Sequence, residues 1–117
     1  MAVVAATRVT HPFDGPTALF RWTLTNGDTA MPAITLVKAD KTVTVEGTFG
    51  GATVAVTGSC SSTDGATLDT LLDPFQNLLT FTARGTRSVM QNTYQVAPAL
   101  SGGAGSTVDV YLLVQGG

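Results

Sequence analysis

Charged side chains are scarce in this sequence. They make up 12% of its 117 residues, whereas an average soluble domain has about 25%. Hydrophobic residues account for 44%. Disordered chains combine low hydrophobicity with high charge, so the composition favours a folded domain. A sparsely charged surface suits a protein that packs against other proteins, and a threonine-rich sheet face on an ordinary soluble domain accounts for it equally well.

Positive charge is sparse and also dispersed. The formal net charge is −2, and the basic residues are Arg8, Arg21, Lys38, Lys41, Arg84 and Arg87. No stripe of Lys or Arg is present to displace counterions from phosphates. The sequence therefore predicts no direct contact with nucleic acid.

Cysteine and histidine occur once each, as Cys60 and His11. A single cysteine forms no intrachain disulfide, so the sequence does not require an oxidising compartment. A nucleophilic thiol needs a base, and nothing in the sequence brings this thiol and this imidazole together. We expect Cys60 to be a dispensable small residue and His11 to be an exposed loop residue.

The carboxylates form no recognisable metal motif. Most of them lie in predicted turns, where Asp caps backbone N–H groups. Asp64, Asp69 and Asp73 are close enough in sequence to suggest a calcium loop, but their spacing is not that of an EF-hand. The glycines of SGGAGS (101–106) precede a predicted strand, so no helix N-terminus is present there to hold a phosphate. We predict no catalytic, cofactor-binding or metal-binding residue and no enzyme.

Long hydrophobic runs are missing as well. Residues 1–7 (MAVVAAT) are apolar, but Arg8 interrupts them and no basic segment precedes them. Such a stretch is too short to span a membrane and makes a poor signal peptide. We predict no membrane association, and we interpret residues 1–17 as an N-terminal arm or strand.

Alternation of apolar and polar residues is the main pattern that the sequence does contain. Residues 43–58 (VTVEGTFGGATVAVTG) place two alternating runs around a Gly50-Gly51 pair, which is typical of a hairpin with a primed turn. The predicted pairs are Phe49–Ala52, Gly47–Val54, Val45–Val56 and Val43–Gly58 on an apolar face, and Thr48–Thr53, Glu46–Ala55 and Thr44–Thr57 on a threonine-rich face. We expect a strongly fixed register, because a slip of one residue would exchange the two faces.

Strand signals recur along the rest of the chain. Separated by Gly, Pro, Asn and Asp, they cover residues 2–10, 18–24, 34–40, 67–72, 79–82, 93–100 and 107–114. Residues 86–91 are predicted to form one helical turn, with Thr86 as N-cap and Asn92 as stop. Pro98 indicates an edge position or a bulge. Short strands at this spacing predict an all-β fold: a single domain over residues 1–117 that forms an antiparallel β-sandwich, Ig-like or jelly-roll-like, with an extended N-terminal segment.

Aromatic residues make up only 7% of the chain. Trp22 shares its strand face with Phe20 and Leu24, which predicts a core position. Tyr111 lies on the opposite face from the apolar residues of its strand and is expected at the surface. Together with Tyr94, these side chains form the one candidate platform for stacking a sugar.

The last two-thirds of the sequence, from Lys41 onward, resembles a known group of proteins. Residues 41–59 (KTVTVEGTFGGATVAVTGS) are followed by a polar Asp-Gly loop, LTFTARG (79–85), a short predicted helical turn, an extended Pro-containing segment and SGGAGSTVDVYL (101–112). This order of features is similar to that of small tailed-bacteriophage virion proteins that accompany the major capsid protein, including head decoration or cement proteins.

This resemblance implies a non-enzymatic function. The chain would bind the outer surface of the major capsid protein lattice and stabilise the head, so it would be made in the host cytoplasm and lie on the capsid surface. Its partners would be the major capsid protein and other copies of itself, in a trimer for example. The alternatives are another virion component, such as a tail tube, connector or baseplate protein, and a carbohydrate- or host-surface-binding β-sandwich module.

Overall fold

A computed structural model describes residues 3–9, 17–34, 39–61, 67–91 and 93–116. The described residues form strands and no helix. The strands are β1 (Val3–Val4), β2 (Thr7–Val9), β3 (Thr17–Thr25), β4 (Thr29–Ala30), β5 (Ala33–Ile34), β6 (Ala39–Thr48), β7 (Thr53–Ser59), β8 (Asp69–Thr70), β9 (Thr80–Phe81), β10 (Gly85–Val89), β11 (Gln95–Ser101) and β12 (Thr107–Gly116).

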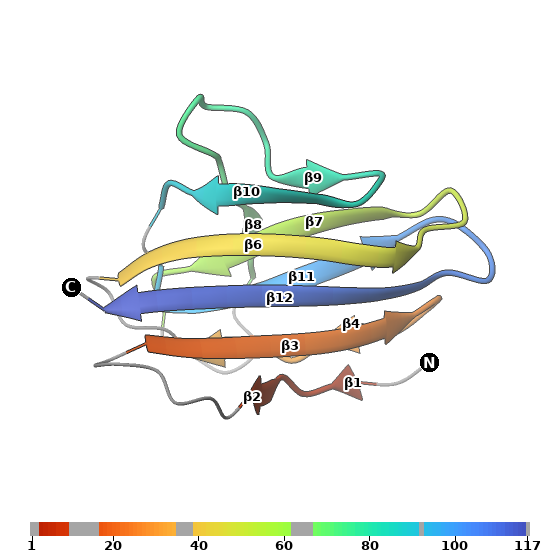
Figure 1. The fold of residues 1–117 in the computed structure, drawn as a ribbon, viewed down its shortest axis with the longest axis horizontal. Coiled ribbons are helices and arrows are strands. Elements are labelled where there is room, and N and C mark those ends of the chain that lie inside the picture. Colours follow the sequence, from red (N-terminus) through yellow and green to blue (C-terminus); the bar gives the residue numbers. More distant parts are fainter. Residues whose placement is uncertain (1–2, 10–16, 35–38, 62–66, 92, 117) are drawn as a thin grey trace.

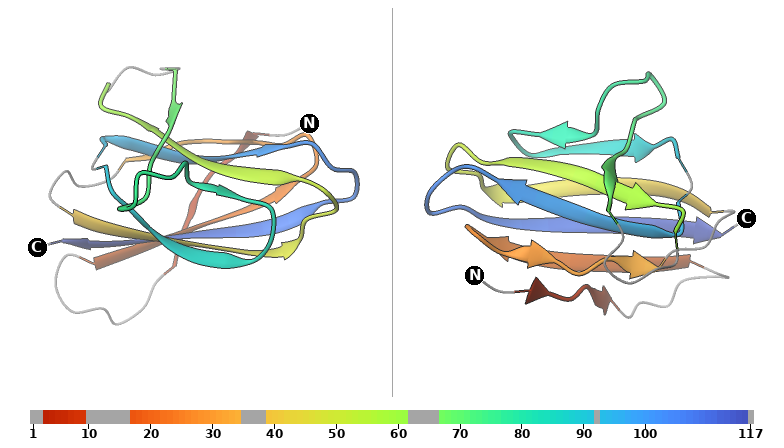
Figure 2. Two further views of the ribbon diagram at one scale, coloured as in Figure 1. Left: turned by 90° about the horizontal axis from the view of Figure 1, so that it is seen from above. Right: turned by 180° about the vertical axis from the view of Figure 1, so that it is seen from behind.

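Two five-stranded sheets pack face to face (Figures 1 and 2). The first sheet has the order β10-β6-β12-β3-β2, and the second has the order β5-β11-β7-β8, with β9 also paired to β7. The strand pairs in both sheets are antiparallel, while β1 and β4 form a separate parallel pair. The predicted all-β sandwich is confirmed.

The core lies between the two sheets and follows from the alternation of the strands. Along β12, every second residue is buried, and these residues are Val108, Val110, Leu112 and Val114. Trp22 and Leu24 of β3 are buried against the same core, as predicted. Fully burying one such side chain contributes about 1.5–3 kcal/mol, so the two inner faces dominate the stability of the fold.

The predicted hairpin is wrong in its pairing. The turn itself is present: the Ala52 N–H donates to the Phe49 carbonyl oxygen (2.9 Å), and φ is positive at Gly50 and Gly51. However, β6 pairs with β10 and β12, whereas β7 pairs with β11 in the opposite sheet. The turn therefore connects the two layers, and the apolar faces of β6 and β7 both line the core instead of lying side by side in one sheet.

Partner strands explain this outcome. β12 pairs with β6 over ten residues, and β11 pairs with β7 over seven. With β6 and β7 in opposite layers, the valines of one strand cover those of the other, which removes apolar surface from water without a further layer. The alternation predicted which side chains are buried, and it held no information about the partner of each strand.

Two of the connections between the sheets lie next to each other at one end of the molecule. They are the Gly50-Gly51 turn and the loop of residues 102–106 between β11 and β12, which Figure 1 shows beside each other. A Cβ atom on Gly103 would lie 2.6 Å from the Ala52 nitrogen. The backbones approach so closely that a side chain at this position does not fit.

The helical turn predicted at residues 86–91 is also wrong. Residues 85–89 form β10, which pairs with β6 from Gly85 opposite Val45 to Val89 opposite Lys41. A single helical turn has little stability of its own, even with a capping residue such as Thr86. Pairing with β6 and burial of Val89 favour the strand.

Pro98 lies where one side of β11 is open, as an edge position requires. On that side β5 pairs only with Gln95 and Val96, so among the described strand pairs none uses the backbone beside Pro98. The missing N–H of proline therefore costs no ladder hydrogen bond. The other side of β11 pairs with β7, with Pro98 opposite Val56.

Candidate functional surfaces

Exposed apolar side chains are concentrated at two places on the sandwich. Among the described residues, the large hydrophobic side chains that are exposed are Val3, Met31, Phe75, Leu78 and Met90. Phe75 and Leu78 belong to the loop before β9, and Met90 directly follows β10. Val3 belongs to β1, and the backbone N–H of Met31 donates to the Val4 carbonyl oxygen (2.7 Å). These two groups lie near β10 and β2, which are opposite edges of the first sheet.

Phe75 and Leu78 of the first group are carried by residues 73–78, which we call the Asp73 loop. It rises above β9 and β10 in Figure 1. Asp73 is buried, and its Oδ1 atom accepts hydrogen bonds from the backbone N–H groups of Phe75 (2.9 Å) and Asn77 (3.0 Å). The backbone of Asp73 closes the loop by accepting from Gln76 and donating to Asn77. Side-chain and backbone bonds together fix the shape of the loop.

Arg87 of β10 supports the Asp73 loop from below. Its guanidinium donates to Asp73 Oδ2 (2.5 Å) and to the carbonyl oxygens of Leu78 (3.2 Å) and Thr80 (3.0 Å). It also lies over the Phe81 ring, 5.5 Å from the ring centre. The hydrogen bond from Arg87, aided by those from the backbone, lowers the pKa of the Asp73 carboxyl below its ordinary value.

The loop presents an apolar tip. Phe75 is 85% exposed although its backbone is held in place. Leu78 pairs with Leu72 in a β-bridge, and the Met90 N–H donates to the Leu72 carbonyl oxygen (2.9 Å). Three backbone segments thus run side by side and bring these apolar residues together. A fixed loop with an exposed aromatic tip has the properties of a protein contact.

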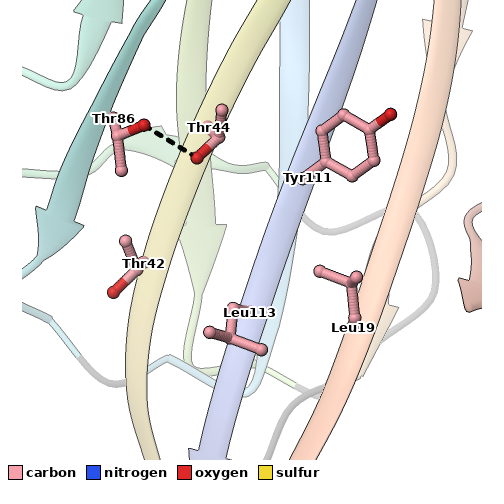
Figure 3. A pocket seen from close by; sticks show the side chains of 6 residues that line it. All are labelled: Leu19, Thr42, Thr44, Thr86, Tyr111 and Leu113. Atoms are coloured by element: carbon pink, nitrogen blue, oxygen red, sulfur yellow. Dashed lines mark hydrogen bonds between the residues drawn. The ribbon is translucent and has the colours of Figure 1, made fainter. Parts of the chain in front are cut away.

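The outer face of the first sheet carries an apolar hollow of about 480 Å³. Figure 3 shows its lining residues: Leu19, Thr42, Thr44, Thr86, Tyr111 and Leu113. They come from four adjacent strands, β10, β6, β12 and β3. The strand register sets Tyr111 opposite Thr44 and Leu113 opposite both Thr42 and Leu19. Tyr111 is therefore on the outer face, as predicted.

Negative charge borders this hollow. Glu46 and Asp109 lie opposite each other on β6 and β12, one outward-facing position beyond Thr44 and Tyr111. The Thr23 hydroxyl donates to Asp109 Oδ1 (2.6 Å). Inside the hollow, the hydroxyl groups of Thr44 and Thr86 are hydrogen-bonded to each other (2.9 Å; Figure 3). The exposed Arg21 lies opposite Tyr111 on β3, so charges of both signs border the neutral hollow.

The second apolar group lies at the N-terminal edge, which we define as Val3 and Met31. The β1 strand pairs with β4, and β2 pairs with β3, so residues 3–9 lie along the sandwich as strands. Val4 and Ala6 pack against the core, while Val3 is 68% exposed. The Trp22 indole N–H donates to the Met31 carbonyl oxygen (2.9 Å), which ties this edge to the core.

The candidate catalytic and metal-ligating side chains form no cluster within the described part of the chain. Cys60 is a free, exposed thiol. His11 and Asp64 lie outside the described residues, Asp69 is exposed on β8, and Asp73 is bound to Arg87. No group of three His, Cys, Asp or Glu side chains within the described ranges could hold a metal ion. The described residues also contain no helix that is long and apolar enough to cross a membrane.

Three residues have positions that sequence analysis missed. Lys41 is 2% exposed and lies in β6 between Val89 and Val114. Burial lowers the pKa of its amine, while the neighbouring Asp40 raises it by less. Arg87 lies on the same face of β10 as Val89, and this alternation was the available signal that it points inward. Nothing in the sequence pattern marked Phe75, which lies in a turn without periodicity.

Comparison with known proteins adds no family to this description. No protein-family profile matches the sequence, and no curated protein matches it significantly.

Proposed function

We propose that this chain is a non-enzymatic decoration protein of a tailed-phage capsid. It binds the outer surface of the major capsid protein lattice and stabilises the head. The proposal is based on the resemblance of residues 41–117 to phage virion proteins, together with the distribution of apolar surface on the sandwich.

The observation that carries the proposal is the presence of two separate apolar contact regions on one weakly charged domain. A subunit that decorates a lattice needs contacts in more than one direction. The Asp73 loop and the N-terminal edge lie at opposite edges of the first sheet, so one subunit can engage two neighbours at once. Several modest contacts of this kind raise the effective affinity without any catalytic group.

We assign attachment to the shell to the N-terminal edge. Val3 and Met31 present apolar side chains there, and both are fixed to the core through neighbouring backbone hydrogen bonds. A protein that binds the assembled shell but not its free subunits stabilises the shell by linkage. Decoration would therefore raise the temperature at which the head releases its DNA.

The test uses capsids that lack the protein. Wild type and the double variant Val3→Asp/Met31→Asp are added, and binding is measured by co-sedimentation and by heat release of DNA. We expect wild type to bind and to raise the release temperature, and the double variant to do neither, because charge at an apolar contact is costly to desolvate. Ser101→Asp, a charge introduced at another exposed position, serves as the control.

Two results would contradict the proposal. One is wild-type protein that does not bind capsids under any condition. The other is location: antibody labelling of purified particles that finds the protein only on the tail would favour a tail tube, connector or baseplate role.

A further inference from the structure

The outer face of the first sheet is uncovered in the described part of the chain. Figure 1 looks onto this face, and no described strand lies in front of β6, β12 and β3. The centre of the face is the apolar hollow, which contains the half-buried side chains of Leu19, Tyr111 and Leu113. We propose that this face packs against the same face of a second copy, so that the protein forms a two-fold symmetric dimer. The dimer does not depend on the proposed attachment to a capsid.

The pattern of residues on this face is complementary to itself, which a two-fold contact requires. Two neighbouring strands carry the pattern, because the register sets Leu19, Arg21 and Thr23 of β3 opposite Leu113, Tyr111 and Asp109 of β12. A two-fold axis that runs along the sheet between these strands places β3 of each copy over β12 of the other. Each outward-facing position of one strand then meets an outward-facing position of the other strand.

Apolar side chains meet in one half of this contact. Leu19 of one copy lies against Leu113 of the other, and symmetry forms the same pair a second time. Both leucines line the hollow, so each copy covers the hollow of its partner. Aligned sheets pack about 10 Å apart, with the side chains of the two faces interdigitated. Removal of this apolar surface from water favours association.

Opposite charges meet in the other half. Arg21 is exposed, and within the described residues it has no ion-pair partner in its own chain. In the dimer its guanidinium lies over the Tyr111 ring of the other copy, next to Asp109, which is one outward-facing position further along β12. A guanidinium over an aromatic ring is attractive, and the opposite charges fix the register of the two faces.

The mixture of charges also identifies the occupant of this face. An acidic partner would meet Asp109 and Glu46, and a basic partner would meet Arg21. The centre between them is neutral, because the hydroxyl groups of Thr44 and Thr86 are bonded to each other (Figure 3). A second copy presents the same two signs of charge in exchanged positions, so its charges match those of the first copy.

Sedimentation velocity of the purified full chain tests the dimer. We expect wild type to form a dimer and nothing larger, because an isologous contact uses the same surface of both copies. Arg21→Glu and Asp109→Arg should each raise the dissociation constant at least about tenfold, since each variant sets like charges against each other. Asp69→Arg makes the same charge change at an exposed position of β8, in the second sheet, and should leave the dimer intact.

Mixing the two variants gives the decisive result. In a mixed dimer the new acidic side chain faces the new basic one, and the unchanged Arg21 and Asp109 also face each other, so the one-to-one mixture should regain the dimer. Wild type that stays monomeric or grows beyond a dimer, single variants that dimerise like wild type, or a mixture that stays monomeric would each overturn the proposal.

A second basic variant covers a folding defect. Asp109 accepts from the Thr23 hydroxyl, so Asp109→Arg removes a bond within the chain as well as a charge. Glu46 lies beside Asp109 on β6. Should Asp109→Arg fail to fold, Glu46→Arg takes its place, with the same results expected alone and in the mixture with Arg21→Glu.

Discussion

Asp73 and Arg87 show how two charged residues can fix the shape of a loop that exposes an apolar side chain, Phe75. Asp73 binds two backbone N–H groups and the Arg87 guanidinium, and Arg87 binds two carbonyl oxygens on the far side of the loop. Removing either charge would leave several buried or half-buried polar groups without partners. The exposed position of Phe75 therefore depends on residues that are themselves mostly covered.

Acid should weaken this arrangement. The pKa of folded Asp73 lies below its ordinary value of 3.8, chiefly because of the hydrogen bond from Arg87. The charged carboxylate therefore stabilises the fold above that pH, and its contribution is lost as the pH falls through the lowered pKa. We expect Asp73→Asn to melt below wild type at pH 7, and the difference to shrink as the pH falls below 3.8.

Thermal melts at a series of pH values test this expectation. Asp69→Asn is the matched control, because Asp69 is an exposed aspartate on the neighbouring β8 strand. A constant difference between Asp73→Asn and wild type at all pH values would show that the charge of Asp73 is not what holds the loop.

At the scale of elements, the glycine pair correctly indicated a tight turn, but it did not indicate whether the two flanking strands pair with each other. Gly50 and Gly51 form the predicted tight turn, yet the strands on either side enter different sheets. A hairpin and a crossing between layers need the same alternating strands and the same positive φ angles. The choice between them is made by β11 and β12, which are distant in sequence and pair with β7 over seven residues and with β6 over ten.

The Gly50-Gly51 turn and the neighbouring loop of residues 102–106 differ in how much space each glycine has. Gly51 and Gly103 both have positive φ, but a Cβ on Gly51 would meet no atom within 4 Å, whereas one on Gly103 would lie 2.6 Å from a backbone nitrogen. We expect Gly51→Ala to cost about 1 kcal/mol through backbone strain alone. Gly103→Ala should cost clearly more, because the two loops must also move apart.

Urea unfolding of both variants gives these free energies. The comparison controls for the φ penalty, which is common to both positions. Equal costs for Gly51→Ala and Gly103→Ala would mean that the two loops do not pack against each other as described.

The sequence predicted the elements better than their assembly. Alternation identified the buried faces of β3, β6, β7 and β12, because burial on one face is a local pattern. It failed at β10, where a five-residue strand depends on pairing with β6. Of the candidate surfaces, it placed Tyr111 outward but did not find Phe75. Exposure of Phe75 results from contacts between Asp73 and Arg87, which are 14 residues apart.

At the scale of the whole molecule, the two edges of the first sheet are short. The β2 strand has three residues and β10 has five. Short edge strands offer little backbone for uncontrolled pairing with other chains. The contacts proposed above would therefore have to come from side chains, and the large exposed apolar side chains lie near these edges.

The contacts of the N-terminal residues show whether they are a free arm or part of the folded domain. A free arm could be removed without harm to the domain. Here Val4 and Ala6 pack against the core, the Val4 carbonyl accepts from the Met31 N–H, and β2 pairs with β3.

We expect deletion of residues 1–10 to lower the free energy of unfolding by about 2 kcal/mol or more through lost burial. Val3→Asp should leave it almost unchanged, because Val3 is exposed. Urea titration of both proteins makes the comparison, and a truncated chain as stable as wild type would mean that these residues are an arm.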